Sequence, residues 1–226
     1  SFRRLVKASL YDDPLPHRFV LLDGFTGTAK TEILPRLAAR GVQVIDLEGL
    51  ARHRGSLLGG MPGGQPSQKA FETGLATALS KLDPARPVVV EAESSKIGRI
   101  AIPASVWAAM LAAPRIVIQA PMVARAAYLA SAYREVIEDR EIVAEKLAPL
   151  RRLRGHATVD RWIALSAEGA LVDLSHALMV DHYDPSYAKS RRIDEREVLT
   201  EVSVDTLDDA GQERAADGIA AAVSAW

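Results

Sequence analysis

The sequence contains no cysteine among its 226 residues. This absence excludes disulfide bonds, thiolate metal sites and any cysteine nucleophile supplied by this chain, and it suits a reducing compartment. The sequence also lacks an apolar run long enough to span a bilayer, and Ser1 to Arg4 lack the apolar core of a signal peptide. We therefore expect a soluble cytoplasmic protein without a membrane partner.

Charge of one sign is not in excess either. The formal net charge is −1, from 28 Lys and Arg against 29 Asp and Glu, so no global basic field predicts nucleic-acid binding. Any RNA contact has to come from local basic patches. With 48% hydrophobic residues the chain can bury a core, and its length allows one large domain or a core with a helical insertion.

The chain is organised around a strand–loop–helix segment. Phe19 to Leu22 is a short apolar run that fits a buried strand, and a helical pattern starts at Thr31. The residues between them follow the phosphate-loop spacing G-x-x-x-x-G-K-S/T, except that alanine stands at the place of the second glycine. The predicted phosphate-binding residues are Gly24, Phe25, Thr26, Gly27, Thr28, Ala29, Lys30 and Thr31.

The residue types of this loop have a chemical reason. Its backbone N–H groups converge on one point, and the following helix adds its positive end. Lys30 would reach the terminal phosphate oxygens, and the Thr31 hydroxyl would ligate Mg²⁺. The alternative is an ordinary Gly/Thr turn, but the strand–loop–helix context favours a phosphate loop. The methyl group of Ala29 lies where backbone and phosphate approach closely.

Further apolar strands alternate with helical patterns, at 42–46, 87–93 and 115–119. This alternation predicts parallel βαβ units and a sheet covered on both faces. We therefore expect an α/β fold, a P-loop NTPase-like parallel sheet flanked by helices, with a helical subdomain. The expected divisions are a linker helix at 1–16, a P-loop core at 17–121, a mainly helical subdomain at 122–195, and a final strand and helix at 196–226.

Two segments of the expected core are predicted to be irregular. Residues 47–68 are rich in Gly, Pro and Ser and read as one long loop, which in a compact domain is usually functional. Residues 94–99 read as a polar turn.

Acidic residues follow two of the predicted strands. Asp46 and Glu48 follow the second strand, and Glu91 and Glu93 end the third. The carboxyl ends of parallel strands face the ligand crevice, where acidic groups hold Mg²⁺ or orient a nucleophile. The alternative is a solvated carboxylate that caps the next element. Because two strand ends agree, we predict Lys30, Asp46 and Glu91 as catalytic residues, and Thr31 and Glu91 as metal ligands.

Local basic patches occur at several places. The segment 52–56, Arg-His-Arg-Gly-Ser, offers planar donors suited to phosphate and one group that titrates near neutrality. Basic runs at 151–154 and 189–192, the second preceded by tyrosines, would stack on unpaired bases and hold RNA backbone. For each patch the alternative is a solvated surface. The predicted substrate or tRNA contacts are Arg52, His53, Arg54, Ser56, Gln65, Gln68, Lys96, Arg99, Tyr183, Tyr187 and Arg191.

An ordered series of motifs resembles a known family. The series comprises residues 24–31, 45–56, 65–72, 90–98 and 183–187, and it spans nearly the whole chain. It looks like the P-loop part of tRNA 2-selenouridine synthase, and the stretch from Asp46 to Ser56 is more specific than the phosphate loop itself.

The resemblance implies a function and partners. In that family a rhodanese domain with a catalytic cysteine precedes the P-loop domain, and residues 1–10 here resemble the segment that follows it. The family converts wobble 2-thiouridine of tRNA to 2-selenouridine, first by geranylation of the sulfur from geranyl diphosphate and then by selenophosphate. The implied ligands are geranyl diphosphate or a nucleotide, with Mg²⁺. The implied partners are the tRNA anticodon region and a rhodanese domain in cis or in trans. Without cysteine, this chain alone is expected to be incomplete for selenation.

Two other functions are compatible with the same residues. The first is a nucleoside or small-molecule kinase of the P-loop class, with Asp46 as base and residues 122–153 as a lid. The second is a nucleotide-gated RNA-binding module. Transfer of label from a γ-phosphate to nucleosides would favour the kinase.

Overall fold

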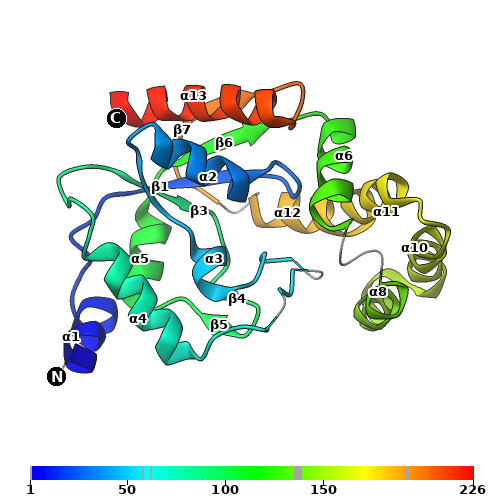
Figure 1. Ribbon diagram of the computed structural model, residues 1–226, viewed down its shortest axis with the longest axis horizontal. Coiled ribbons are helices and arrows are strands. Elements are labelled where there is room, and N and C mark those ends of the chain that lie inside the picture. Colours follow the sequence, from blue (N-terminus) through cyan, green and yellow to red (C-terminus); the bar gives the residue numbers. More distant parts are fainter. Residues whose placement is uncertain (1, 57–58, 62, 135–138, 192–193) are drawn as a thin grey trace.

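A five-stranded, fully parallel sheet forms the centre of the computed structural model (Figure 1), which describes residues 2–56, 59–61, 63–134, 139–191 and 194–226. The strand order is β2-β3-β1-β6-β7. All six residues of β1 are buried. Because β1 is the central strand, the loop that leaves it emerges in the middle of the sheet edge. The bounds are β1 (Phe19–Gly24), β2 (Gln43–Ile45), β3 (Val88–Glu91), β6 (Arg115–Gln119) and β7 (Val198–Ser203).

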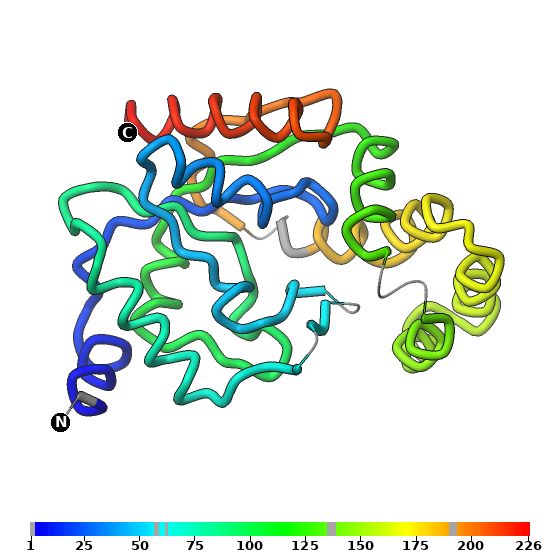
Figure 2. Tube along the Cα trace, viewed as in Figure 1, coloured from blue at the N-terminus to red at the C-terminus, as the bar shows by residue number. Residues whose placement is uncertain are grey.

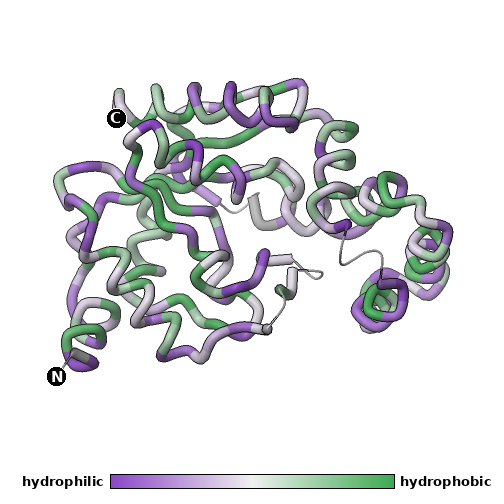
Figure 3. The backbone as a smooth tube through the Cα atoms, in the orientation of Figure 1, coloured by the Kyte–Doolittle hydropathy of each residue, from purple (hydrophilic) through white to green (hydrophobic). Residues whose placement is uncertain are grey.

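Helices cover both faces of this sheet, as Figure 1 shows. One face carries α2 (Lys30–Ala39) and α13 (Asp209–Ala225), and the other carries α1 (Phe2–Lys7), a π-helical turn (Ala8–Asp12), α4 (Gln68–Leu79) and α5 (Ala104–Ala112). Alternate residues of β1 enter the two cores: Leu22 packs with Ile33 on the α2 face, and Leu21 with Phe71 on the other. The apolar strands stand out at the centre of Figure 3. The predicted P-loop NTPase-like α/β fold is confirmed.

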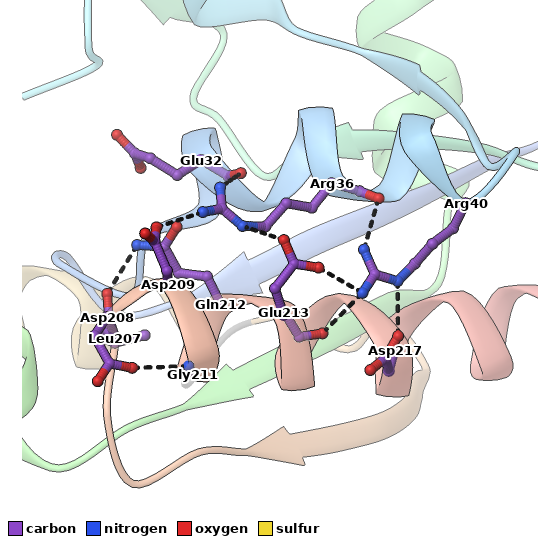
Figure 4. A network of polar contacts seen from close by, with 10 residues as sticks. All are labelled: Glu32, Arg36, Arg40, Leu207, Asp208, Asp209, Gly211, Gln212, Glu213 and Asp217. Carbon is purple, nitrogen blue, oxygen red and sulfur yellow. Dashed lines mark hydrogen bonds and ion pairs between the residues drawn. The ribbon is translucent and has the colours of Figure 1, made fainter.

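A ladder of ion pairs joins α2 to α13 on the surface of the first face (Figure 4). Arg36 pairs with Asp209 and Glu213, and Arg40 pairs with Glu213 and Asp217. Pairs of this exposure contribute at most about 1 kcal/mol each. The two helices are therefore held mainly by apolar contact, to which these pairs add little.

Residues 122–134 and 139–191 form a helical unit at one end of the molecule, on the right in Figure 2. Trp162, Val143, Leu147 and Leu174 are fully buried and make a small core of its own. Its elements are α6 (Met122–Ala132), α8 (Arg140–Leu147), a 3-10 turn (Ala148–Leu150), α9 (Arg151–Arg154), α10 (His156–Glu168), α11 (Leu171–Leu178), a π-helical turn (Met179–Tyr183) and α12 (Asp184–Arg191).

Two predicted irregular segments are partly regular. The expected loop at 47–68 begins with helix α3 (Leu47–Ala51), because the Asp46 carboxylate accepts a hydrogen bond from the Gly49 N–H and caps it. The expected turn at 94–99 contains a hairpin of β4 (Lys96–Ile97) and β5 (Ile100–Ala101). None of the helices that the structure describes is long and apolar enough to cross a membrane.

Candidate functional site

The loop between β1 and α2 has the backbone of a phosphate cradle. Helix α2 begins without a side-chain cap, so its first N–H groups are open to a ligand at the positive end of the helix. Ala29 has φ 57° and ψ 30°, a left-handed conformation that costs a residue with a Cβ about 1 kcal/mol. This conformation explains why the motif places glycine here. Ala29 makes the same turn, with its methyl group buried.

A pocket of about 210 Å³ lies against this loop. The Lys30 ammonium lies over it and donates to the Gly24 carbonyl at 3.1 Å. Residues from outside the loop complete the lining. They are Glu48 from α3, Glu93 from the segment after β3, Arg54 and Ser56 from the segment after α3, and Tyr128, Tyr133, Tyr183 and Tyr187 from the helical unit. This pocket, which we call the phosphate pocket after the predicted ligand of its loop, therefore lies between the core and the helical unit.

Carboxylates gather around the Thr31 hydroxyl on the core side of the pocket. The Thr31 oxygen is 2.9 Å from Glu48 Oε2 and 3.0 Å from Glu91 Oε1. A hydroxyl carries one proton, so it donates to one carboxyl group and the other must bring its own proton. Burial, followed by the charge of Glu48, raises the pKa of Glu91 well above its ordinary value. Burial also raises the pKa of Glu48, and that of Glu93 to about 8.

These groups suit a divalent cation that is completed by a phosphate ligand. Glu91 is 1% exposed, and its Oε2 has no hydrogen-bond partner among the residues that the structure describes. Mg²⁺ prefers hard oxygen ligands and at such loops takes the hydroxyl, phosphate oxygens and waters. Among the described residues, no group of three or more His, Asp or Glu side chains forms a metal cage by itself. Thr31 and Glu91 therefore fit Mg²⁺ only together with a bound phosphate.

The acidic cluster predicts how stability depends on pH. A carboxyl group with a raised folded pKa contributes stability below its unfolded pKa, and this contribution disappears as pH rises through the folded value. Without Mg²⁺, we expect the free energy of unfolding to fall between about pH 5 and pH 8. Glu93→Gln should flatten that fall, whereas Glu145→Gln, on the exposed face of α8, should not. Urea unfolding at pH 5, 7 and 9 measures the free energy of unfolding of the unaltered chain and of the two variants. If that free energy depends on pH equally in all three proteins, the prediction is wrong.

The segment after α3 closes one side of the pocket. Arg54 donates to the Ala132 carbonyl at 2.6 Å and lies over the Tyr133 ring, and the Ser56 hydroxyl is 2.9 Å from the Tyr133 hydroxyl. Gly55, at φ 63°, passes so close to Glu48 that a Cβ would lie 2.5 Å from its Oε1. This close approach explains the glycine between Arg54 and Ser56, both of which the sequence predicted as contacts.

The other predicted residues of this segment lie outside the pocket. His53 Nδ1 accepts from the Gly55 N–H at 3.1 Å, and burial, with the charge of Lys146, lowers the pKa of His53. Arg52 ends α3 in a left-handed conformation with φ 48°. Neither side chain lines the phosphate pocket.

Two predicted glutamines hold the β4–β5 hairpin. Gln65 donates to the Ile97 carbonyl and accepts from the Arg99 N–H, both at 2.8 Å, and Gln68 bonds both backbone groups of Ala101. These two, with exposed Lys96 and Arg99, lie away from the phosphate pocket. Their contact with a substrate or tRNA stays a prediction.

Asp46 and Glu48, the two acids that follow β2, make different contacts. The Asp46 carboxylate caps α3, at 2.6 Å from the Gly49 nitrogen, and does not line the pocket. Glu48, two residues on, is the carboxylate that contacts Thr31. The catalytic role of Asp46 stays a prediction.

The two predicted tyrosines lie against the phosphate loop. Tyr187 donates to Asp23 Oδ1 at 2.6 Å, and its ring centroid is 4.5 Å from that of Phe25; Tyr183 lines the pocket. Stacking on RNA bases stays a prediction for both. The side chain of Arg191 lies outside the described part of the chain.

Sequence reasoning missed the buried Arg125–Asp184 ion pair. Arg125, 4% exposed, donates from Nε to the Thr26 carbonyl, and its guanidinium binds both carboxylate oxygens of Asp184, at 2.6 and 3.1 Å. The same guanidinium lies 4.9 Å from the Phe25 ring centroid. The pair thus ties α6 and α12 to the phosphate loop. The available signal was a lone arginine in an apolar helix and an aspartate within the 183–187 motif.

Comparison with known proteins shows which family the chain belongs to. The model of the tRNA 2-selenouridine synthase AAA domain matches residues 17–160, which include the phosphate loop and the carboxylate cluster. The chain belongs to this family. Relatives named tRNA 2-selenouridine synthase include that of Alcanivorax borkumensis, 32% identical over 195 residues, which cover 74% of this chain and 53% of the relative.

A second such relative, from Shewanella halifaxensis, is 29% identical over 215 residues, which cover 83% of this chain and 58% of the relative. A third, from Hahella chejuensis, is 42% identical over 122 residues, 53% of this chain and 31% of the relative. This member of the selenouridine synthase family thus spans little more than half the length of the first and second relatives.

Proposed function

We propose that this chain is the diphosphate-binding part of a tRNA-modifying transferase that converts wobble 2-thiouridine to 2-selenouridine through an S-geranyl intermediate. Family membership and the names of the relatives support the tRNA substrate. One structural observation carries the proposal: residues of the loop, Lys30 and Thr31 all line one pocket, and the Thr31 hydroxyl bonds the buried Glu91 behind it. That arrangement suits a diphosphate, for which geranyl diphosphate is our first choice and a nucleotide the second.

The proposed reaction needs a stabilised leaving group. The thiocarbonyl sulfur of 2-thiouridine forms a bond to the first carbon of the geranyl group, the carbon–oxygen bond breaks, and the diphosphate leaves with its electron pair. The N3 proton of the base passes to water, so that the S-geranyl base is neutral. Lys30 and the N–H groups at the start of α2 stabilise the negative charge that grows on the diphosphate. Arg54 lines the same pocket. Thr31 and Glu91 would hold Mg²⁺, which adds further positive charge when bound.

The basic runs supply fewer free cations than their sequence suggests. Arg151 pairs with Asp160, and Arg154 bonds His182 and Ser186. For Arg152 and Lys189 the described residues show no ion pair. We propose that these two cations bind RNA phosphates, with the chain acting in the cytoplasm on the tRNA anticodon region.

Mass spectrometry of digested tRNA tests the proposed reaction. The chain, incubated with Mg²⁺, geranyl diphosphate and 2-thiouridine tRNA, is expected to form S-geranyl-2-thiouridine. It is expected to form no selenouridine when selenophosphate is added, because it carries no cysteine for the step that the family assigns to one. Adding a rhodanese domain in trans should then restore selenation. Selenouridine made by the chain alone would contradict this division of labour.

A phosphate-transfer assay separates the proposed function from that of a kinase. The helical unit beside the phosphate pocket resembles a lid over a nucleotide, which favours a kinase as the second candidate. With γ-labelled ATP and nucleosides, a kinase would transfer the label. A transferase of the proposed kind would bind tRNA and would leave the labelled phosphate on ATP.

A further inference from the structure

A second cleft opens beside the phosphate pocket at the carboxyl edge of the sheet. Its volume is about 860 Å³, and it shares Ala92, Glu93 and Tyr187 with the phosphate pocket. The two cavities are therefore neighbours, separated by residues that line both. The proposed function assigns no occupant to this cleft.

One wall of the cleft is apolar and comes from the end of α5. Trp107 and Leu111 line it, and Leu111 is 51% exposed. Trp107 is only half-buried, although its inner part packs on the core. An aromatic ring and a neighbouring leucine at the mouth of a reaction pocket offer a surface on which a flat ring can stack.

The opposite wall is polar and carries negative charge. The buried Arg115 binds Asp23 at 3.2 Å and Asp194 at 2.9 Å, and Arg196 also binds Asp194 at 2.7 Å. Both guanidinium groups are thus paired with carboxylates, and Glu195 adds a further acid to the lining. This wall holds three carboxylates, of Asp23, Asp194 and Glu195, and only two guanidinium groups, so it disfavours phosphate. A hydrocarbon chain against it would cover the exposed carboxylate of Glu195 without offering it a hydrogen bond. An uncharged ring with N–H and carbonyl groups satisfies both walls.

We propose that this cleft receives the uncharged pyrimidine base of the acceptor nucleotide, turned out of the RNA strand, while the RNA phosphates stay outside. This inference rests on the proposed function and names the place of its second substrate. Enzymes that act on a base commonly take it out of the stack and hold it against aromatic or apolar side chains. Tyr187 and Glu93, at the junction of the two cavities, place the reacting edge of the base toward the phosphate pocket.

The test compares two anticodon stem-loop RNAs, one with 2-thiouridine and one with an abasic site at the wobble position. The full chain is expected to bind the intact RNA roughly tenfold more tightly, because a stacked base is lost in the abasic one. Trp107→Ala should bind both RNAs equally, at the affinity of the abasic form. Leu111→Glu tests the same wall at an exposed position that tolerates a polar residue. Leu5→Glu, on the 69% exposed Leu5 of α1, is its matched control and should keep the tenfold preference.

The outcomes separate this inference from the proposed function. Equal affinities in Trp107→Ala and Leu111→Glu, with the preference kept in Leu5→Glu, support the cleft. If Leu111→Glu folds and keeps the full preference, the base lies elsewhere, although RNA binding itself stands. If the unaltered chain binds neither RNA, the cleft assignment and the tRNA part of the proposed function both fail, while diphosphate binding is measured independently.

Discussion

Lys30→Ala is expected to weaken diphosphate binding by about 100-fold while the fold stays intact. The Lys30 ammonium lies at the phosphate loop, where it donates hydrogen bonds to the carbonyls of Gly24 at 3.1 Å and Phe25 at 3.5 Å. A 100-fold change in affinity corresponds to about 2.7 kcal/mol, and each hydrogen bond from a cation to a phosphate oxygen contributes roughly 1.5–3 kcal/mol, so the loss of one such bond is enough to account for the factor.

Calorimetry with inorganic diphosphate and with geranyl diphosphate, each with Mg²⁺, measures this effect. Lys69→Ala is the matched control, because Lys69 is an exposed lysine on α4 and lies outside the phosphate pocket. Circular dichroism of both variants should match the unaltered chain. An unchanged affinity in a folded Lys30→Ala protein would remove the phosphate-loop assignment.

Asp184→Ala is expected to lower the free energy of unfolding by about 3 kcal/mol or more. The Arg125 side chain is 5% exposed and that of Asp184 is 19% exposed, so removal of the carboxylate leaves a buried guanidinium without its partner. Such an uncompensated buried charge costs far more than a lost surface pair. Because Arg125 also holds the Thr26 carbonyl, the variant should bind diphosphate less tightly as well.

Urea unfolding against a matched surface pair measures the stability change. Asp160→Ala removes the carboxylate partner of Arg151, and because that pair is largely exposed its loss should cost at most about 1 kcal/mol. The double variant Arg125→Met with Asp184→Leu should recover much of the loss, since it buries no charge. A loss in Asp184→Ala no larger than in Asp160→Ala would show that the pair does not hold the helical unit on the phosphate loop.

The fold class is predicted correctly from local patterns in the sequence, and the candidate phosphate loop is identified by the same kind of signal. Apolar strands in alternation with helices dictate a covered parallel sheet, because such strands have no polar face to expose. The loop from Gly24 to Thr31 is predicted from its glycines, its lysine and its threonine, which stand at fixed spacing. These are local signals, readable because spacing and residue type act within a few residues.

Only the tertiary structure decided which distant residues complete the site. Asp46 and Glu48 are both acids after the same strand, but capping of α3 occupies Asp46 and turns Glu48 toward Thr31. Tyr187 bonds Asp23 across 164 positions of sequence, which no local pattern encodes. Burial, a property of the packed chain, raises the pKa of Glu91. Chain packing decides these contacts because it brings together groups whose sequence separation carries no signal of their distance in space.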